Sequence, residues 1–182
     1  MQKSIEKHNF FGGRLMEENK LMKISDSVVT KQTFMEIKKF NEETLEYGLK
    51  LSDEDIKIIL RTRSESLRNN GRVEFGGAII KNIIETFCDS PYISQYNYLE
   101  TLDELIEVFY YYKNETLDFI GDDELIEIMK QYFDNECQGS LEQLRDKYLD
   151  SIAHNIKYGV KDYLKVDDKD EGVMDEDEQQ DY

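Results

Sequence analysis

Apolar residues recur every three or four positions through most of the chain, which is the spacing of one face of an α-helix. No stretch alternates convincingly with the period of two that a half-buried strand requires, although the run LMKISDSVV at residues 21–29 is compatible with a short strand. The clearest helical stripe lies within residues 98–120 and consists of Leu102, Leu105, Phe109, Tyr112 and Thr116. The pattern therefore predicts an all-α fold.

Helix-capping residues divide this pattern into about six helices. Gly48 suits a left-handed C-cap for the first helix, and Ser52 suits an N-cap for the second because acids follow it in the first turn. Pro91 marks the end of the third helix. Short connections favour a compact single-domain bundle of antiparallel neighbours. The predicted helices span residues 30–47, 53–69, 73–88 and 98–120, with a fifth capped by Asp122 and a sixth opening at Gly139-Ser140.

Composition divides the chain into three parts. The sequence predicts a helical domain over residues 30–158 and a weakly ordered segment over residues 1–29 before it. Residues 166–182 hold nine acids and one base, so they cannot bury enough apolar area to offset the entropy of ordering. We predict a disordered acidic C-terminal tail, which acts either as a solubilising segment or as a flexible ligand for a basic patch.

The charge and the cysteines exclude several classes of function. A net charge of −17 repels a phosphate backbone, so nucleic-acid binding is not expected. No apolar run approaches the length of about 18 residues that indicates a membrane span, and the N-terminus lacks the apolar stretch of a secretory signal. Two distant cysteines, Cys88 and Cys137, do not make a disulfide framework. These features predict a reduced protein of the cytoplasm that does not enter the membrane.

No arrangement of residues specifies a reaction. The two histidines, His8 and His154, do not stand beside a cysteine or serine in a recognised nucleophile context. The EF-hand spacing fails when either Gly139 or Gly172 is placed at its sixth position. The acids at residues 122–124 suit a helix start, and a divalent-ion site is the weaker alternative. The sequence therefore offers no catalytic residues, no metal ligands and no cofactor motif, and it favours a protein that is not an enzyme.

The glycine pair Gly76-Gly77 does not fit a phosphate-binding loop. Both glycines share a predicted helical face with apolar residues, where glycine lowers helix stability but lets another helix approach closely. Close helix packing and a backbone opened to a ligand are the two interpretations of this pair.

Four of the six arginines lie within residues 61–72 of this acidic chain. In helical projection Arg63 lies in an apolar stripe, whereas Arg61 and Arg68 share a different face. An arginine in such a stripe forms an internal salt bridge or anchors a bound anion, because an unpaired buried charge is strongly unfavourable. Arg61, Arg68 and Arg72 balance neighbouring acidic helices, or receive the acidic tail or an acidic partner.

Two tyrosines of the run VFYYYKNE point away from the core stripe that contains Tyr112. Tyr110 and Tyr111 are large aromatics, which occur both in interhelical seams and on partner-binding surfaces. The sequence leaves these two placements open.

Long strings of the sequence are similar to a known family. The runs GRVEFGGAIIKNIIETFCDSPYI and YLETLDELIEVFYYYKNETLDFIGDDELIEIMKQYFD, with CQGSLEQL after them, resemble a family of uncharacterised Firmicute proteins, a domain of unknown function. The resemblance covers roughly residues 30–155. It implies a clostridial-type source and a cytoplasmic location, and it implies no activity and no site residues.

These observations lead to one main hypothesis and two alternatives. We predict a non-enzymatic helical module that binds another protein, without a cofactor. The first alternative is a small-molecule or anion-binding domain, or an enzyme, with Arg63 as the charged anchor of an interhelical pocket. The second is autoinhibition, in which the tail covers the arginines. The candidate ligand- or partner-binding residues are Arg61, Arg63, Arg68, Arg72, Tyr110 and Tyr111.

Overall fold

The structure is a computed structural model and describes residues 30–74 and 76–166. Within these ranges the chain is helical and forms no strand, so the predicted all-α class is confirmed. A helix over residues 30–44 comes first. The later elements are η1 (Leu45–Tyr47), α2 (Asp53–Asn69), α3 (Ala78–Phe87), α4 (Tyr98–Glu115), α5 (Asp122–Asp134), α6 (Leu141–Gln143), the π-helical η2 (Leu144–Leu149) and α7 (Asp150–Lys157).

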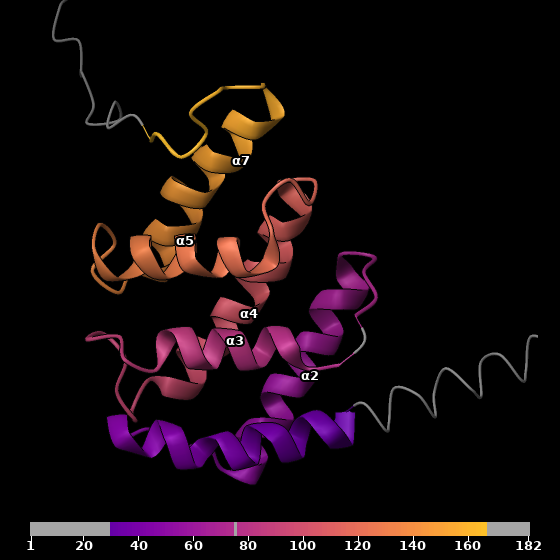
Figure 1. The fold of residues 1–182 in the computed structure, drawn as a ribbon, viewed down its shortest axis with the longest axis vertical. Helices are drawn as coiled ribbons and strands as arrows, with labels where there is room; N and C mark the ends of the chain where they lie inside the picture. Colours follow the sequence, from indigo (N-terminus) through magenta and orange to yellow (C-terminus); the bar gives the residue numbers. More distant parts are fainter. Residues whose placement is uncertain (1–29, 75, 167–182) are drawn as a thin grey trace, which may run out of the picture.

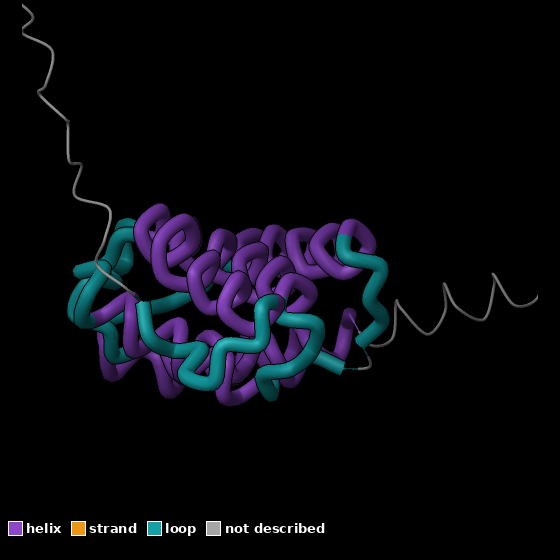
Figure 2. The backbone as a smooth tube through the Cα atoms, turned by 90° about the horizontal axis from the view of Figure 1, so that it is seen from above, coloured by secondary structure: helices purple, strands orange, loops and turns teal. Residues whose placement is uncertain are grey.

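α4 is the central element and contacts α2, α3, α5, α6 and α7. In Figure 1 the 30–44 helix, α3 and α5 cross the view one above another, and α4 runs along the long axis between them. Figure 2 shows the same molecule from above, with residue 30 and residue 166 at opposite ends. The apolar faces of these helices form one core, in which the whole predicted stripe of α4 is buried. None of the described helices combines the length and the apolar character that crossing a membrane requires.

The first two helix ends lie where the sequence predicts them. Gly48 has a φ of 74°, the left-handed conformation of a C-cap. The Ser52 hydroxyl accepts a hydrogen bond from the Asp55 backbone N–H, and the Asp55 carboxylate accepts one from the Ser52 backbone N–H. This reciprocal capping box fixes the start of α2.

Three predicted helix boundaries are wrong. The third helix begins at Ala78 instead of residue 73, because Gly76 is left-handed with a φ of 103°. The fourth ends at Glu115 instead of residue 120, and two left-handed residues follow it. The N-cap of α5 is Gly121, so Asp122 is the first residue of this helix.

The position of Gly77 requires a residue without a side chain. It is the N-cap of α3, and a Cβ added there would lie 2.1 Å from Cγ2 of Thr33 on the 30–44 helix. Glycine thus permits the close helix approach that the sequence indicates, at a helix start instead of a helix interior.

The sixth predicted helix is interrupted by a π-helical stretch that the sequence does not reveal. The hydroxyl of Tyr112 donates a 2.7 Å hydrogen bond to the backbone carbonyl of Arg145. The same carbonyl accepts the backbone N–H of Asp150, five residues further on. A side chain from α4 therefore forms a hydrogen bond with the widened turn. Insertion of a side chain into the hydrogen-bond ladder of a helix is a known cause of such interruptions.

The predictions of a strand at residues 21–29, of a weakly ordered segment at residues 1–29 and of a disordered tail concern residues almost all outside the described ranges. Of the tail, only Val166 is described.

Candidate functional site

Arg63 is buried, and acceptors of its own chain surround its guanidinium. Its Nη2 donates to the backbone carbonyl of Gly76 at 2.5 Å and to that of Glu74 at 3.4 Å. Among the described residues, the nearest carboxylate oxygen, on Glu74, lies 3.6 Å away, and Nε has no hydrogen-bond partner. Arg63 lines none of the cavities described below. Its observed role is to bind the loop between α2 and α3 onto the core.

Tyr110 occupies the same buried corner. Only 2% of its surface is exposed, and its hydroxyl donates a short hydrogen bond to the Glu74 carboxylate. Burial, and next the nearby charge of Glu74, raise the pKa of Tyr110, so the phenol stays protonated and acts as the donor. Of the two placements that the sequence leaves open, Tyr110 takes the interhelical one.

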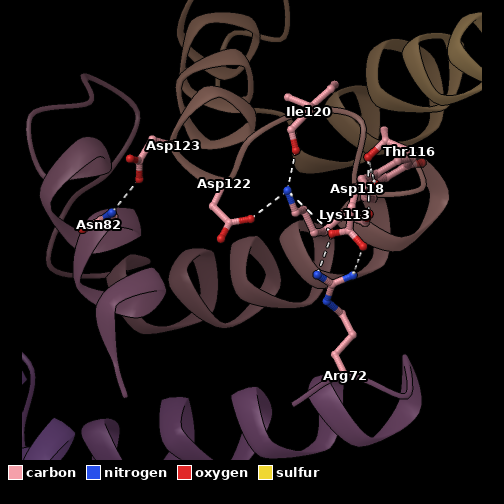
Figure 3. Close-up of polar contacts among 9 residues, drawn as sticks. Arg72, Asn82, Lys113, Thr116, Asp118, Ile120, Asp122 and Asp123 are labelled. Atoms are coloured by element: carbon pink, nitrogen blue, oxygen red, sulfur yellow. Dashed lines mark hydrogen bonds and ion pairs between the residues drawn. The ribbon is translucent and has the colours of Figure 1, made fainter. Parts of the chain in front are cut away.

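Arg72 belongs to an ion-pair network at the connection from α4 to α5 (Figure 3). Its guanidinium donates to both carboxylate oxygens of Asp118, at 3.1 and 2.7 Å. The buried ammonium of Lys113 lies 3.7 Å from Asp118 and 2.8 Å from Asp122, and it donates to the Ile120 carbonyl. The hydrogen bond from Arg72 lowers the pKa of the Asp118 carboxyl below its ordinary value. This network fixes the loop and leaves Arg72 engaged.

Arg61 and Arg68 differ from the other two arginines of the cluster. Both side chains are exposed, and neither guanidinium makes a hydrogen bond or an ion pair with another described residue. Arg68 lies in the last turn of α2, where a cation stabilises the negative end of the helix dipole. Arg61 lies two turns earlier, at the edge of a cavity.

The cavity beside Arg61 is a shallow groove of about 630 Å³ between the 30–44 helix and α2. We call it the Arg61 groove. Its surface is mainly apolar, with Phe34 and Leu60 as its hydrophobic side chains, and three cationic residues stand around them. The lining residues are Thr30, Lys31, Phe34, Lys57, Leu60, Arg61 and Ser64.

The cations of the Arg61 groove are only partly neutralised. Lys57 pairs with Glu54 at 3.0 Å, with both side chains exposed to water. Lys31 and Arg61 have no ion-pair partner among the described residues. Because such exposed pairs are weak, the groove keeps most of its positive character on a chain whose net charge is −17.

Tyr111 lies on another part of the surface. It is 47% exposed and packs edge-on against Tyr112, with 5.0 Å between ring centroids. It lines a hollow of about 450 Å³ together with Arg145, Asp146 and Asp150. Within this hollow, Nε of Arg145 donates a 2.6 Å hydrogen bond to the Asp146 carboxylate. The structure thus does not bring Tyr111 together with Arg61.

A third hollow, of about 520 Å³, lies between α3 and α5 and is rich in carboxylates. Its single cation, Lys130, is bonded to Asp89 at 2.9 Å and to Asp134. Asn82 donates to Asp123 at 2.8 Å. These polar groups satisfy one another, and the described residues contain no group of three or more His, Cys, Asp or Glu placed to hold a metal ion.

The two cysteines are buried free thiols. Burial raises the pKa of Cys137 to about 11 and also raises the pKa of Cys88. Both thiols are therefore largely protonated at neutral pH and are poor nucleophiles.

The described residues form an all-helical protein with an apolar groove, and two of the three cations that line this groove have no ion-pair partner among those residues. Residues 36–162 match the model of a family described as a family of unknown function, DUF6323, and the chain belongs to that family. The resemblance predicted from the sequence thus holds at the level of a family of unknown function. No curated protein and no solved structure matches the chain significantly.

Sequence reasoning identifies one of the lining residues of the Arg61 groove, Arg61 itself. It misses Phe34 and Lys31 because their position depends on how the 30–44 helix packs on α2. It also misses the buried role of Lys113, although a lysine inside an apolar helix such as α4 is a signal that was available in the sequence.

Proposed function

We propose that this protein is a non-enzymatic interaction module, which binds an acidic segment of a partner protein in the Arg61 groove. The observation that carries this proposal is the guanidinium of Arg61, which lies at the edge of an apolar groove and has no hydrogen-bond or ion-pair partner among the described residues. Apolar surface rimmed by polar groups is typical of a protein-binding site. The positive charge of the cations around the groove favours an acidic ligand.

The contributions of the two kinds of contact differ in size. An exposed ion pair contributes about 0–1 kcal/mol, whereas burying one valine, leucine or methionine side chain contributes about 1.5–3 kcal/mol. The ligand therefore needs at least one apolar residue among its acids to occupy the space between Phe34 and Leu60. The cations then contribute orientation, association rate and sensitivity to salt.

The proposal places the protein in the cytoplasm of a Firmicute. Its support is the pair of free cysteines, Cys88 and Cys137, which suits a reducing compartment, together with the sequence resemblance. The net charge of −17 supports a protein partner over a nucleic acid.

The test uses the full chain with a photo-crosslinking amino acid in place of Ser64, which lines the groove and is exposed. The chain is illuminated in native-host lysate, and captured partners and their crosslinked peptides are identified by mass spectrometry. We expect an acidic peptide with an apolar residue. Arg61→Glu should reduce capture about tenfold, since it removes one attraction and adds one repulsion.

Arg68→Glu is the matched control. It makes the same charge change on the same face of α2, two turns away and outside the groove. Equal loss in both variants would indicate a nonspecific charge effect, and capture that is unchanged by Arg61→Glu would contradict the proposal.

A further inference from the structure

We infer that the occupant of the Arg61 groove is the acidic segment of residues 167–182 from a second copy of this chain. This inference rests on the proposed function and names the ligand of the same groove. Charge is the first support. The segment holds nine acidic residues and one lysine, a net charge of −8 over 16 residues, whereas the groove presents Lys31, Lys57 and Arg61.

The segment also supplies the apolar anchor that the groove requires. Val173 and Met174 stand together in the run DEGVMDEDE, with acids on both sides. Phe34 and Leu60 are the apolar side chains that would contact this pair. Methionine is flexible and packs well against irregular apolar and aromatic surfaces. The pattern of the segment, an apolar pair between acids, thus complements the pattern of the groove.

Charge also separates this segment from the other end of the chain. Residues 1–29 precede Thr30 and Lys31 in the sequence, and these two residues line the groove. They hold five bases and four acids, a net charge of +1. A segment of that sign gains nothing from a cationic rim. The groove therefore favours residues 167–182 in spite of the greater distance along the chain.

Distance assigns the segment to a second copy. The two ends of the described chain, at residues 30 and 166, lie at opposite ends of the molecule in both views (Figures 1 and 2), and Thr30 lines the groove. The 30–44 helix is about 22 Å long and each helix layer above it adds about 10 Å, so the gap is on the order of 30 Å. Residues 167–173, fully extended, reach about 24 Å. A tail of the same chain would have to be fully extended to bring Val173 near the groove, so we place the contact between two copies.

A contact of this kind joins copies head to tail. The groove of one copy and the tail of the next are different surfaces, so the association forms either a dimer in which two copies exchange tails, or larger rings and open chains. Because several of its contacts are exposed ion pairs, the association should weaken as salt concentration rises.

The experiment detects this contact by paramagnetic broadening between chains. A Gln179→Cys full chain carries a thiol-specific spin label near the apolar pair, and it is mixed with an isotope-labelled wild-type chain that has no spin label. Cys88 and Cys137 are buried with raised pKa values, so the added thiol is the reactive one. Wild-type chain treated with the same reagent is the blank.

We expect selective broadening of amide resonances at Phe34, Lys57 and Leu60 in the mixed sample. Arg61→Glu in the isotope-labelled chain should reduce the broadening about tenfold, and Arg68→Glu should leave it nearly unchanged. Replacing Val173 and Met174 with serine in the spin-labelled chain should also reduce it. Arg61 and Arg68 are exposed, so loss of folding does not account for a difference between Arg61→Glu and Arg68→Glu.

Two results would overturn the inference: no groove-selective broadening in the mixed sample, or broadening only when both labels are on one chain. If broadening is absent while Ser64 crosslinking still captures a partner in an Arg61-dependent way, this inference fails and the proposed function stands. If both experiments are negative, both proposals fail.

Discussion

Lys113 is the buried residue that organises the connection between α4 and α5. Its side chain is almost entirely covered, yet it bridges Asp118, Asp122 and the Ile120 carbonyl. The loop that it ties contains Leu117 and Asp118 in succession at φ values of 54° and 58°, a left-handed conformation that L-residues adopt at a cost. The two left-handed residues therefore lie within a few residues of the ion pairs that stabilise this loop.

The ion pair of Arg72 with Asp118 should make stability depend on pH in the acid range. The pKa of Asp118 is lowered from 3.8 in the folded protein, so its contribution is present above 3.8 and is lost as the pH falls through the folded value. Asp118→Asn should reduce the free energy of unfolding by about 1 kcal/mol at neutral pH, since the carboxylate is half exposed. Asparagine tolerates the left-handed conformation, so the backbone is kept while the charge and one of the two acceptor oxygens are lost.

Denaturant unfolding across this pH range measures the effect. The difference between wild type and Asp118→Asn should shrink toward zero at the most acidic pH, and it should be smaller at neutral pH when Arg72 is already replaced by methionine. A difference that stays constant through the acid range would contradict this role of Asp118.

The strain at Leu117 is separately testable. Leu117 is 73% exposed, so replacing it loses little packing. Leu117→Gly should raise the free energy of unfolding by about 0.5 kcal/mol, because relief of left-handed strain exceeds the added chain entropy. Leu117→Ala keeps a Cβ and should give no such gain. Equal effects of the two variants in denaturant unfolding would show that the backbone conformation is not the cause.

At the scale of elements, apolar spacing predicts helix interiors well and several helix ends poorly. The buried stripe of α4 follows directly from its sequence. The start of α3 cannot be predicted in this way. Arg63 binds the backbone carbonyls of Glu74 and Gly76, and this contact keeps the segment before Ala78 out of the helix. That contact joins residues 11 and 13 positions apart and leaves no mark on local periodicity.

At Gly77, the N-cap of α3, an added Cβ should have a large effect on stability. Gly77→Ala should lower the free energy of unfolding by about 1–3 kcal/mol, because the new Cβ would meet the buried Thr33 side chain at 2.1 Å. Gly121→Ala is the matched control, another helix N-cap glycine, whose Cβ would meet Glu124 only at 4.0 Å. Thermal unfolding compares them, and similar small losses in both would contradict the close approach.

The π-helical stretch should depend on Tyr112. Tyr112→Phe removes the donor to Arg145 and should lower the free energy of unfolding by about 1 kcal/mol. Amide exchange at Asp150 should become faster. Tyr132→Phe removes a similar bond to the Leu164 carbonyl at a more exposed position and should have a smaller effect. The reverse order would contradict the assigned role of Tyr112.

At the scale of the whole molecule, the sequence predicts the exposure of Arg61 and Arg68 but not what lies beside them. Helical projection separates their face from the apolar stripe of Arg63, and the structure has the same division. Arg61 becomes a candidate site only because the 30–44 helix brings Phe34 and Lys31 next to α2. Arg72 and Tyr110 are engaged by Asp118 and Glu74, respectively, so they take no part in the proposal.

The most direct measurement is an NMR titration of the isotope-labelled full chain with a synthetic peptide of residues 167–182. The inference that residues 167–182 occupy the Arg61 groove predicts salt-sensitive shift changes concentrated at residues 30–34 and 57–64, which decrease with Arg61→Glu and persist with Arg68→Glu. Shift changes concentrated around Tyr111 or between α3 and α5, or none at all, would contradict it.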